Sequence, residues 1–127
     1  MLPYCLDQGV GVLPWSPLAR GRLTRDFDDT TTRSETDAFG KTLYRQQEEA
    51  DRRVADAVKT IADARGVSRA QVALAWVRQQ EAVTSPIVGA TKPQHLDDAI
   101  ASVELHLDDD ELVALQGPYV PRAPEGF

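Results

Sequence analysis

The chain has 127 residues, of which 42% are hydrophobic and 27% charged, and its formal net charge is −6. This length suggests one small domain with a core of its own, and it excludes a closed eight-stranded α/β barrel, which needs roughly 250 residues. The acidic balance, without a stripe of Lys and Arg, argues against a nucleic-acid-binding protein.

A single cysteine, Cys5, leaves no partner for an intrachain disulfide and favours a reducing compartment. We expect Cys5 to be buried and unreactive rather than a nucleophile. No apolar run approaches the roughly 18 residues of a membrane span, and residues 1–7 lack the basic and apolar regions of a signal peptide. The expected location is therefore the cytoplasm, with no membrane partner.

The first third of the chain predicts a short helix, a strand and a long irregular segment. Residues 2–8 indicate a helix that stops at Gly9, and residues 10–15 indicate a buried strand. Pro14 interrupts this pattern because proline lacks the N–H that a central strand needs. Residues 18–43 are polar, which is typical either of a surface loop or of a flap over a ligand.

Two helices are expected next. Apolar residues at three- and four-residue spacing predict a helix over residues 45–65, with Gly66 as its C-terminal stop. Ser68 and Gln71 have the spacing of a capping box that begins a second helix, over residues 69–80. This second helix is apolar on several faces, so we expect it to pack against more than one neighbour.

The remaining residues predict a strand followed by two helices. Residues 84–90 indicate a short strand that ends at a glycine, and Pro93 suits the first position of a helix with one apolar side. Asp108 and Glu111 predict a capping box for a last helix through Gln116, and residues 118–127 form a loose tail. Strands alternating with helices imply an α/β fold with a parallel sheet, and two strands alone would leave both edges of that sheet unpaired.

The two strand ends are the places where chemistry is expected, because ligands bind at the carboxyl ends of parallel strands. After the second strand, Gly89 allows a close backbone approach, and Lys92 adds a positive charge at a helix N-terminus, which suits a phosphate. An ordinary strand–turn–helix with a solvated lysine explains the same residues equally well.

Three segments resemble the aldo-keto reductase family. Residues 15–23 (WSPLARGRL) resemble the segment after its seventh barrel strand, residues 73–77 (ALAWV) the helix before strand eight, and residues 86–98 (PIVGATKPQHLDD) its strand-eight phosphate-binding signature. The resemblance runs from about Leu2 to Leu115. It implies the C-terminal part of a (β/α)8 TIM barrel, with residues 1–127 forming a C-terminal fragment of an NADP-dependent oxidoreductase domain.

The resemblance also implies a set of cofactor-binding positions for NADP(H). The loop after strand seven would hold the nicotinamide, ribose and pyrophosphate through Trp15, Ser16, Pro17, Leu18, Arg20 and Gly21. The segment after strand eight would hold the adenosine end through Gly89, Ala90, Thr91, Lys92, His95 and Asp98. A cation beside a hydroxyl suits a 2′-phosphate, so Thr91 and Lys92 favour NADP over NAD. Ala99 departs from the family, which often has Asn there.

No catalytic residue is expected in this chain. The family's catalytic Asp, Tyr, Lys and His lie on its first barrel strands, upstream of the segments matched here, and Tyr4, Tyr44 and Tyr119 do not stand in that context. Asp108 to Asp110 form a helix cap rather than a metal site.

Three hypotheses follow. In the first, the chain is part of a longer parent that reduces a small-molecule aldehyde or ketone with NADPH, together with the missing N-terminal barrel half. In the second, it is a non-catalytic truncated chain with weak nucleotide affinity. In the third, it interacts with a partner barrel through its unpaired strand edges.

Overall fold

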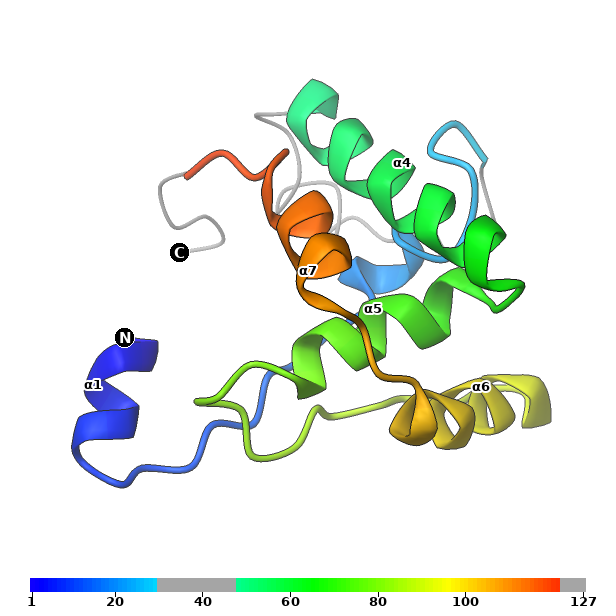
Figure 1. Ribbon diagram of the computed structural model, residues 1–127. Helices are drawn as coiled ribbons and strands as arrows, with labels where there is room; N and C mark the ends of the chain where they lie inside the picture. Colours follow the sequence, from blue (N-terminus) through cyan, green and yellow to red (C-terminus); the bar gives the residue numbers. More distant parts are fainter. Residues whose placement is uncertain (30–47, 122–127) are drawn as a thin grey trace.

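The computed structural model describes residues 1–29 and 48–121. In these ranges the elements are α1 (Leu2–Asp7), the 3₁₀ helix η1 (Ala19–Gly21), α4 (Glu48–Arg65), α5 (Arg69–Arg78), α6 (Pro93–Glu104) and α7 (Asp109–Gln116) (Figure 1). Helices α5, α6 and α7 begin where the sequence predicts, and α4 ends at Arg65, as predicted. The predicted helix start at residues 45–47, most of the irregular segment, Tyr44 and the last six residues lie outside the described residues.

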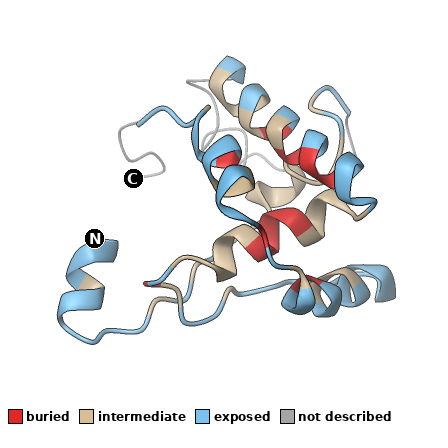
Figure 2. Ribbon diagram, viewed as in Figure 1, coloured by how far each residue is buried: buried red, intermediate tan, exposed pale blue. Residues whose placement is uncertain are grey.

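Three helices share the hydrophobic core. Helix α5 packs against α4 and α6, and α4 packs against α7, which confirms the expectation that α5 has more than one neighbour. Figure 2 shows the buried residues gathered where α4, α5 and α7 face one another. The core cluster consists of Val58, Ile61, Ala62, Val72, Ala75, Leu107 and Leu115.

The helix ends follow the predicted signals with one exception. Gly66, with a φ of +66°, ends α4 in the left-handed conformation that favours glycine. Asp108 and Glu111 form the complete capping box that was predicted for α7. At α5, Ser68 Oγ accepts from Gln71 N, but the Gln71 side chain donates to Asp98 instead of returning to the cap. The capping box predicted at Ser68 is therefore only half formed.

The expectation of a buried strand at residues 10–15 is wrong, because these residues are exposed or half-buried. Residues 10–15 and 83–90 run parallel, as expected, but within the described residues they pair through two single bridges, Val12 with Val83 and Trp15 with Ile87. Trp15 is 62% exposed. Two features shorten the ladder. Pro14 has no N–H to donate, and the Val12 N–H donates to the Thr84 hydroxyl rather than to a backbone carbonyl (3.1 Å).

Apolar side chains outside the core are largely exposed. On α6 the predicted one-sided pattern is present, yet Leu96, Ile100 and Val103 are each more than half exposed, and its one buried residue is Ser102. In Figure 2 the exposed colour covers most of α1 and most of α6. Cys5 in α1 is half-buried rather than buried, which corrects the expectation for that thiol. Across the described ranges, the helices are too short or too polar to cross a membrane.

Candidate functional site

The parallel pairing brings the two strand ends to one place. The Thr84 N–H donates to the Val12 carbonyl (2.9 Å), and the Ile87 N–H donates to the Pro14 carbonyl (3.0 Å). Because Trp15 is thereby paired with Ile87, the segments that follow them, residues 16–23 and 88–92, leave from the same end of the pair. The two predicted groups of site residues therefore begin next to each other, at Trp15 and just after Ile87.

The first segment contains a run of left-handed backbone conformations. Ser16, Ala19 and Arg20 have φ values of 56°, 48° and 56°, and Gly21 has 92°. Only glycine adopts such values without cost, so the three other residues carry strain of order 1–3 kcal/mol each. The segment's own hydrogen bonds oppose that strain: the Arg20 N–H donates to Ser16 Oγ (3.2 Å), and the Gly21 N–H donates to the Leu18 carbonyl (2.9 Å). These hydrogen bonds help to hold the loop in its left-handed conformation.

Aromatic stacking and ion pairs fix this loop on both sides. The Arg20 guanidinium lies over the Trp15 ring, 5.6 Å from its centroid. Further along, Asp26 accepts from Arg69 of α5 (2.6 Å), and Asp28 forms a bidentate pair with Arg52 of α4. The hydrogen bond from Arg69 holds the pKa of Asp26 below its ordinary value, and the hydrogen bond from Arg52 does the same for Asp28. Pro17 and Leu18 are half-buried between these anchors.

The second segment is exposed and ends at a helix N-terminus. Lys92 is the N-cap residue of α6, Pro93 occupies the first turn, and no side chain of the described residues caps that end. Around Gly89 the structure is open, since a Cβ added there would meet no described atom within 4 Å. Thr91 Oγ1 lies 3.4 Å from His95 Nδ1 one turn later. A phosphate here would meet the positive end of the α6 dipole, the Thr91 hydroxyl and the Lys92 ammonium, so these groups could hold the phosphate of a nucleotide.

The carboxylate of Asp98 is bound by two side chains from the start of α5. Its Oδ1 accepts from Ser68 Oγ and from Gln71 Nε2, both at 2.8 Å. Ser68 and Gln71 were missed as site neighbours. Their spacing signals a helix cap, and sequence spacing alone does not reveal a partner about 30 residues away.

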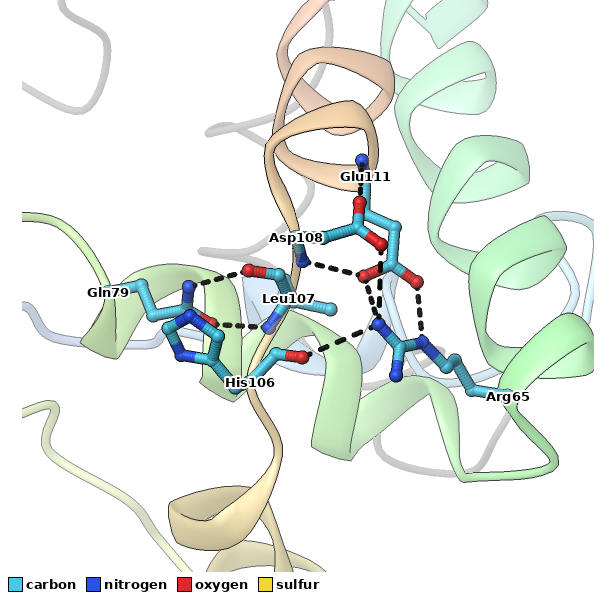
Figure 3. A network of polar contacts seen from close by, with 6 residues as sticks. All are labelled: Arg65, Gln79, His106, Leu107, Asp108 and Glu111. Carbon is cyan, nitrogen blue, oxygen red and sulfur yellow. Dashed lines mark hydrogen bonds and ion pairs between the residues drawn. The ribbon is translucent and has the colours of Figure 1, made fainter.

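A polar network fixes the connection between α6 and α7 where it passes the C-terminal end of α5 (Figure 3). Arg65 donates to both carboxylate oxygens of Glu111 at 2.6 Å, and this hydrogen bonding lowers the pKa of Glu111 and raises that of Arg65. The Gln79 side chain donates to the Leu107 carbonyl (3.0 Å) and accepts from the Leu107 N–H (2.8 Å). The backbone N–H and carbonyl of the buried Leu107 thereby have hydrogen-bond partners. We therefore interpret this network as one that stabilises the packed helices.

Comparison with known proteins agrees with this arrangement. The model of the Aldo/keto reductase family matches residues 1–118. Versiconal hemiacetal acetate reductase of Aspergillus parasiticus is 45% identical over 125 residues, covering 97% of this chain and 36% of that protein. Aldo-keto reductase AMT2 of Alternaria alternata is 35% identical over 127 residues, covering 99% of this chain and 34% of that protein.

A solved structure gives the fold. The glycerol dehydrogenase of Gluconobacter oxydans superposes on 93% of this chain and 36% of its own, with a TM-score of 0.69 and 27% identity. The chain spans about a third of the length of the relatives it matches. The pairing of parallel segments, the order of the helices and these matches agree: the chain belongs to the aldo/keto reductase family, and its fold is part of a (β/α)8 barrel.

Proposed function

We propose that this chain is the C-terminal, NADP(H)-binding part of an aldo-keto reductase that reduces small aldehydes or ketones. The observation that carries the proposal is the pairing of Trp15 with Ile87. Through it, the strained loop after Trp15 and the uncapped N-terminus of α6 begin at the same end of the parallel pair. In parallel α/β folds this end is where ligands bind.

The two loops divide the cofactor between them. The Trp15 ring is exposed and has Arg20 stacked on it, so it offers an aromatic surface for the nicotinamide. The shaped loop through Ser16, Pro17, Leu18 and Gly21 would line the ribose and pyrophosphate, with the Arg20 guanidinium supplying positive charge. When bound, NADP(H) supplies the hydride that reduces a carbonyl carbon.

The phosphate preference follows from the second loop. Thr91 supplies a hydroxyl, Lys92 an ammonium, and α6 the positive end of its helix dipole. A 2′-phosphate needs these groups and a ribose 2′-hydroxyl does not, so the proposal is for NADP rather than NAD. Gly89 and Ala90 leave room for the adenosine, and His95 and Asp98 lie on the adenine side.

The proposal assigns binding rather than proton transfer to the described residues. Tyr4 and Tyr119 are both 66% exposed; Tyr4 lies in α1, and Tyr119 follows α7 and lines a hollow together with Ala19 of the first loop. The names of the relatives, a hemiacetal acetate reductase and a glycerol dehydrogenase, support carbonyl and alcohol chemistry in the parent. The single cysteine supports a reducing cytoplasm as its location.

Titration of NADPH fluorescence against the chain and its Lys92→Ala variant tests the site. The variant should bind NADPH about 10- to 100-fold more weakly, because a charge-assisted hydrogen bond contributes roughly 1.5–3 kcal/mol. NADH binding should change little, since NADH lacks the 2′-phosphate.

Arg53→Ala is the matched control, because it likewise removes one positive charge, from a residue of α4 that pairs with Glu49 at 3.3 Å. It should leave the NADPH affinity unchanged. Equal NADPH affinity for the unsubstituted chain and Lys92→Ala would contradict the assignment of Lys92. Absence of NADPH binding by the unsubstituted chain would contradict a cofactor site in this chain alone.

A further inference from the structure

The hydrogen bonds of Asp98 join α6, whose N-terminus belongs to the candidate cofactor site, to the start of α5. Asp98 lies in the second turn of α6, and its Oδ1 accepts from Ser68 Oγ and Gln71 Nε2 at 2.8 Å each. Ser68 is also the N-cap of α5, where its Oγ accepts from the Gln71 N–H (3.1 Å). One hydroxyl and one amide thus link the start of α5 to α6.

Apolar packing gives α6 little additional support along its exposed side. Its side chains at Leu96, Ile100 and Val103 are more than half exposed, so their burial contributes little to fixing the helix. A second polar anchor lies at the other end of α6, where Arg78 donates to the carbonyls of Ser102 (3.5 Å) and Leu105 (3.2 Å). Among the residues that the structure describes, the hydrogen bonds from Ser68 and Gln71 to Asp98 join the N-terminal half of α6 to α5.

The position of this contact relates it to the phosphate loop. Asp98 is one helical turn beyond His95 and six residues beyond Lys92, about 9 Å along a helix that rises 1.5 Å per residue. A helix moves as a rigid rod over this distance, so a displacement at Asp98 is carried to the uncapped N-terminus. Misplacement of binding groups by about 1 Å is enough to weaken their action severely.

We propose that Ser68 and Gln71 are positioning residues for the cofactor phosphate. They hold Asp98, and through it they set where the first turn of α6, with Thr91 and Lys92, meets the 2′-phosphate. This inference rests on the proposed function. It gives Asp98 a role in orienting its helix, with one carboxylate oxygen committed to two donors from α5.

The test compares substitutions of two glutamines, one in the first turn of α5 and one at its C-cap. Gln71→Ala removes a donor to Asp98, whereas Gln79→Ala removes the two bonds to Leu107 at the other end of α5. Both variants lose one half-buried side-chain amide, so a general loss of stability would affect both. Amide hydrogen exchange without cofactor and the dissociation constants for NADPH and NADH are measured for each.

Gln71→Ala should raise exchange over residues 94–98, weaken NADPH binding about tenfold and reduce the preference for NADPH over NADH. Gln79→Ala should raise exchange around Leu107 and leave the NADPH affinity within about twofold. Ser68→Gly is the second variant, because glycine remains an acceptable N-cap while the hydroxyl that reaches Asp98 is lost. It should act in the same direction as Gln71→Ala.

Two results would overturn the inference. One is unchanged NADPH affinity in Gln71→Ala and Ser68→Gly while the unsubstituted chain binds NADPH. The other is unchanged amide exchange over residues 94–98 in the same two variants. Because exchange is measured without cofactor, this result tests the positioning of α6 independently of NADPH binding. Absence of NADPH binding by the unsubstituted chain would instead overturn the proposed function.

Discussion

Apolar side chains of α4, α5 and α7 lie in a shared core, whereas those of the paired segments 10–15 and 83–90 lie mostly in solvent. Val72 and Ala75 of α5 are fully buried, while Leu13, Trp15 and Ile87 are each more than half exposed. An amphipathic helix completes its burial with one or two neighbouring helices. A strand of a parallel sheet needs partners on both edges and cover on both faces, so the same kind of side chain has different surroundings in the two regions.

The two regions also differ in what we expect them to contribute: the buried helices contribute stability, and the exposed segments lead into the candidate cofactor loops. The candidate cofactor loops begin at the exposed segments, but ion pairs and hydrogen bonds tie them to the helices. Arg69 reaches Asp26 beyond the first loop, and Gln71 reaches Asp98 beyond the second. The core helices therefore act as the support on which both loops are placed, and variants in the two regions should behave differently.

The largest contrast is expected between two leucines. Leu107 is 1% exposed and Leu13 is 59% exposed. Leu107→Ala should lower the free energy of unfolding by about 2–5 kcal/mol, because it removes buried methyl groups and leaves a cavity. Leu13→Ala should change it by less than about 0.5 kcal/mol. Urea unfolding followed by circular dichroism measures both, and equal losses would contradict the division into two regions.

A smaller effect is expected from the cap of α7. Asp108 accepts from the Glu111 N–H at 2.9 Å, so Asp108→Ala should cost about 1 kcal/mol of unfolding free energy. Asp110→Ala is the control, because this exposed residue lies in the same helical turn but is not the cap. Urea midpoints compare the two variants. The capping role would be refuted by an equal loss in both.

The smallest effect is a pH dependence within the helical region. Hydrogen bonding from Arg65 lowers the pKa of Glu111 below its ordinary value of 4.5. A lowered folded-state pKa stabilises the protein above the unfolded-state pKa, and that contribution is lost as the pH falls through the folded-state value. Thermal melts between pH 7 and pH 3 should therefore show a decline on the acid side of 4.5 that is shallower in Glu111→Gln.

Glu49→Gln is the matched control for this pH dependence. Glu49 pairs with Arg53 across one exposed turn of α4, at 3.3 Å, and exposed pairs of this kind contribute little. Its pH profile should follow that of the unsubstituted chain. If both variants flatten the profile equally, the Arg65–Glu111 pair has no special part in acid stability.

The amino-acid pattern alone determined the helices and their ends. Periodic apolar residues located α4, α5 and α6, Gly66 ended α4, and Asp108 with Glu111 opened α7, because these signals act between residues three or four positions apart. The WSPL and GATKP segments likewise indicated the family and the two loops. The roles of the individual site residues toward NADP(H) stay predictions.

Tertiary structure decided the rest. The burial of Leu13 and Trp15 depends on which segments cover them. The two bridges on either side of Pro14 and the hydrogen bond from Gln71 to Asp98 each involve a partner far along the chain. An alternating or apolar run shows which side chains would be buried if a neighbour covered them, but it contains no information on whether that neighbour is there. Local signals are sufficient for a helix, whose hydrogen bonds are internal, and insufficient for a parallel strand, whose hydrogen bonds all go to other segments.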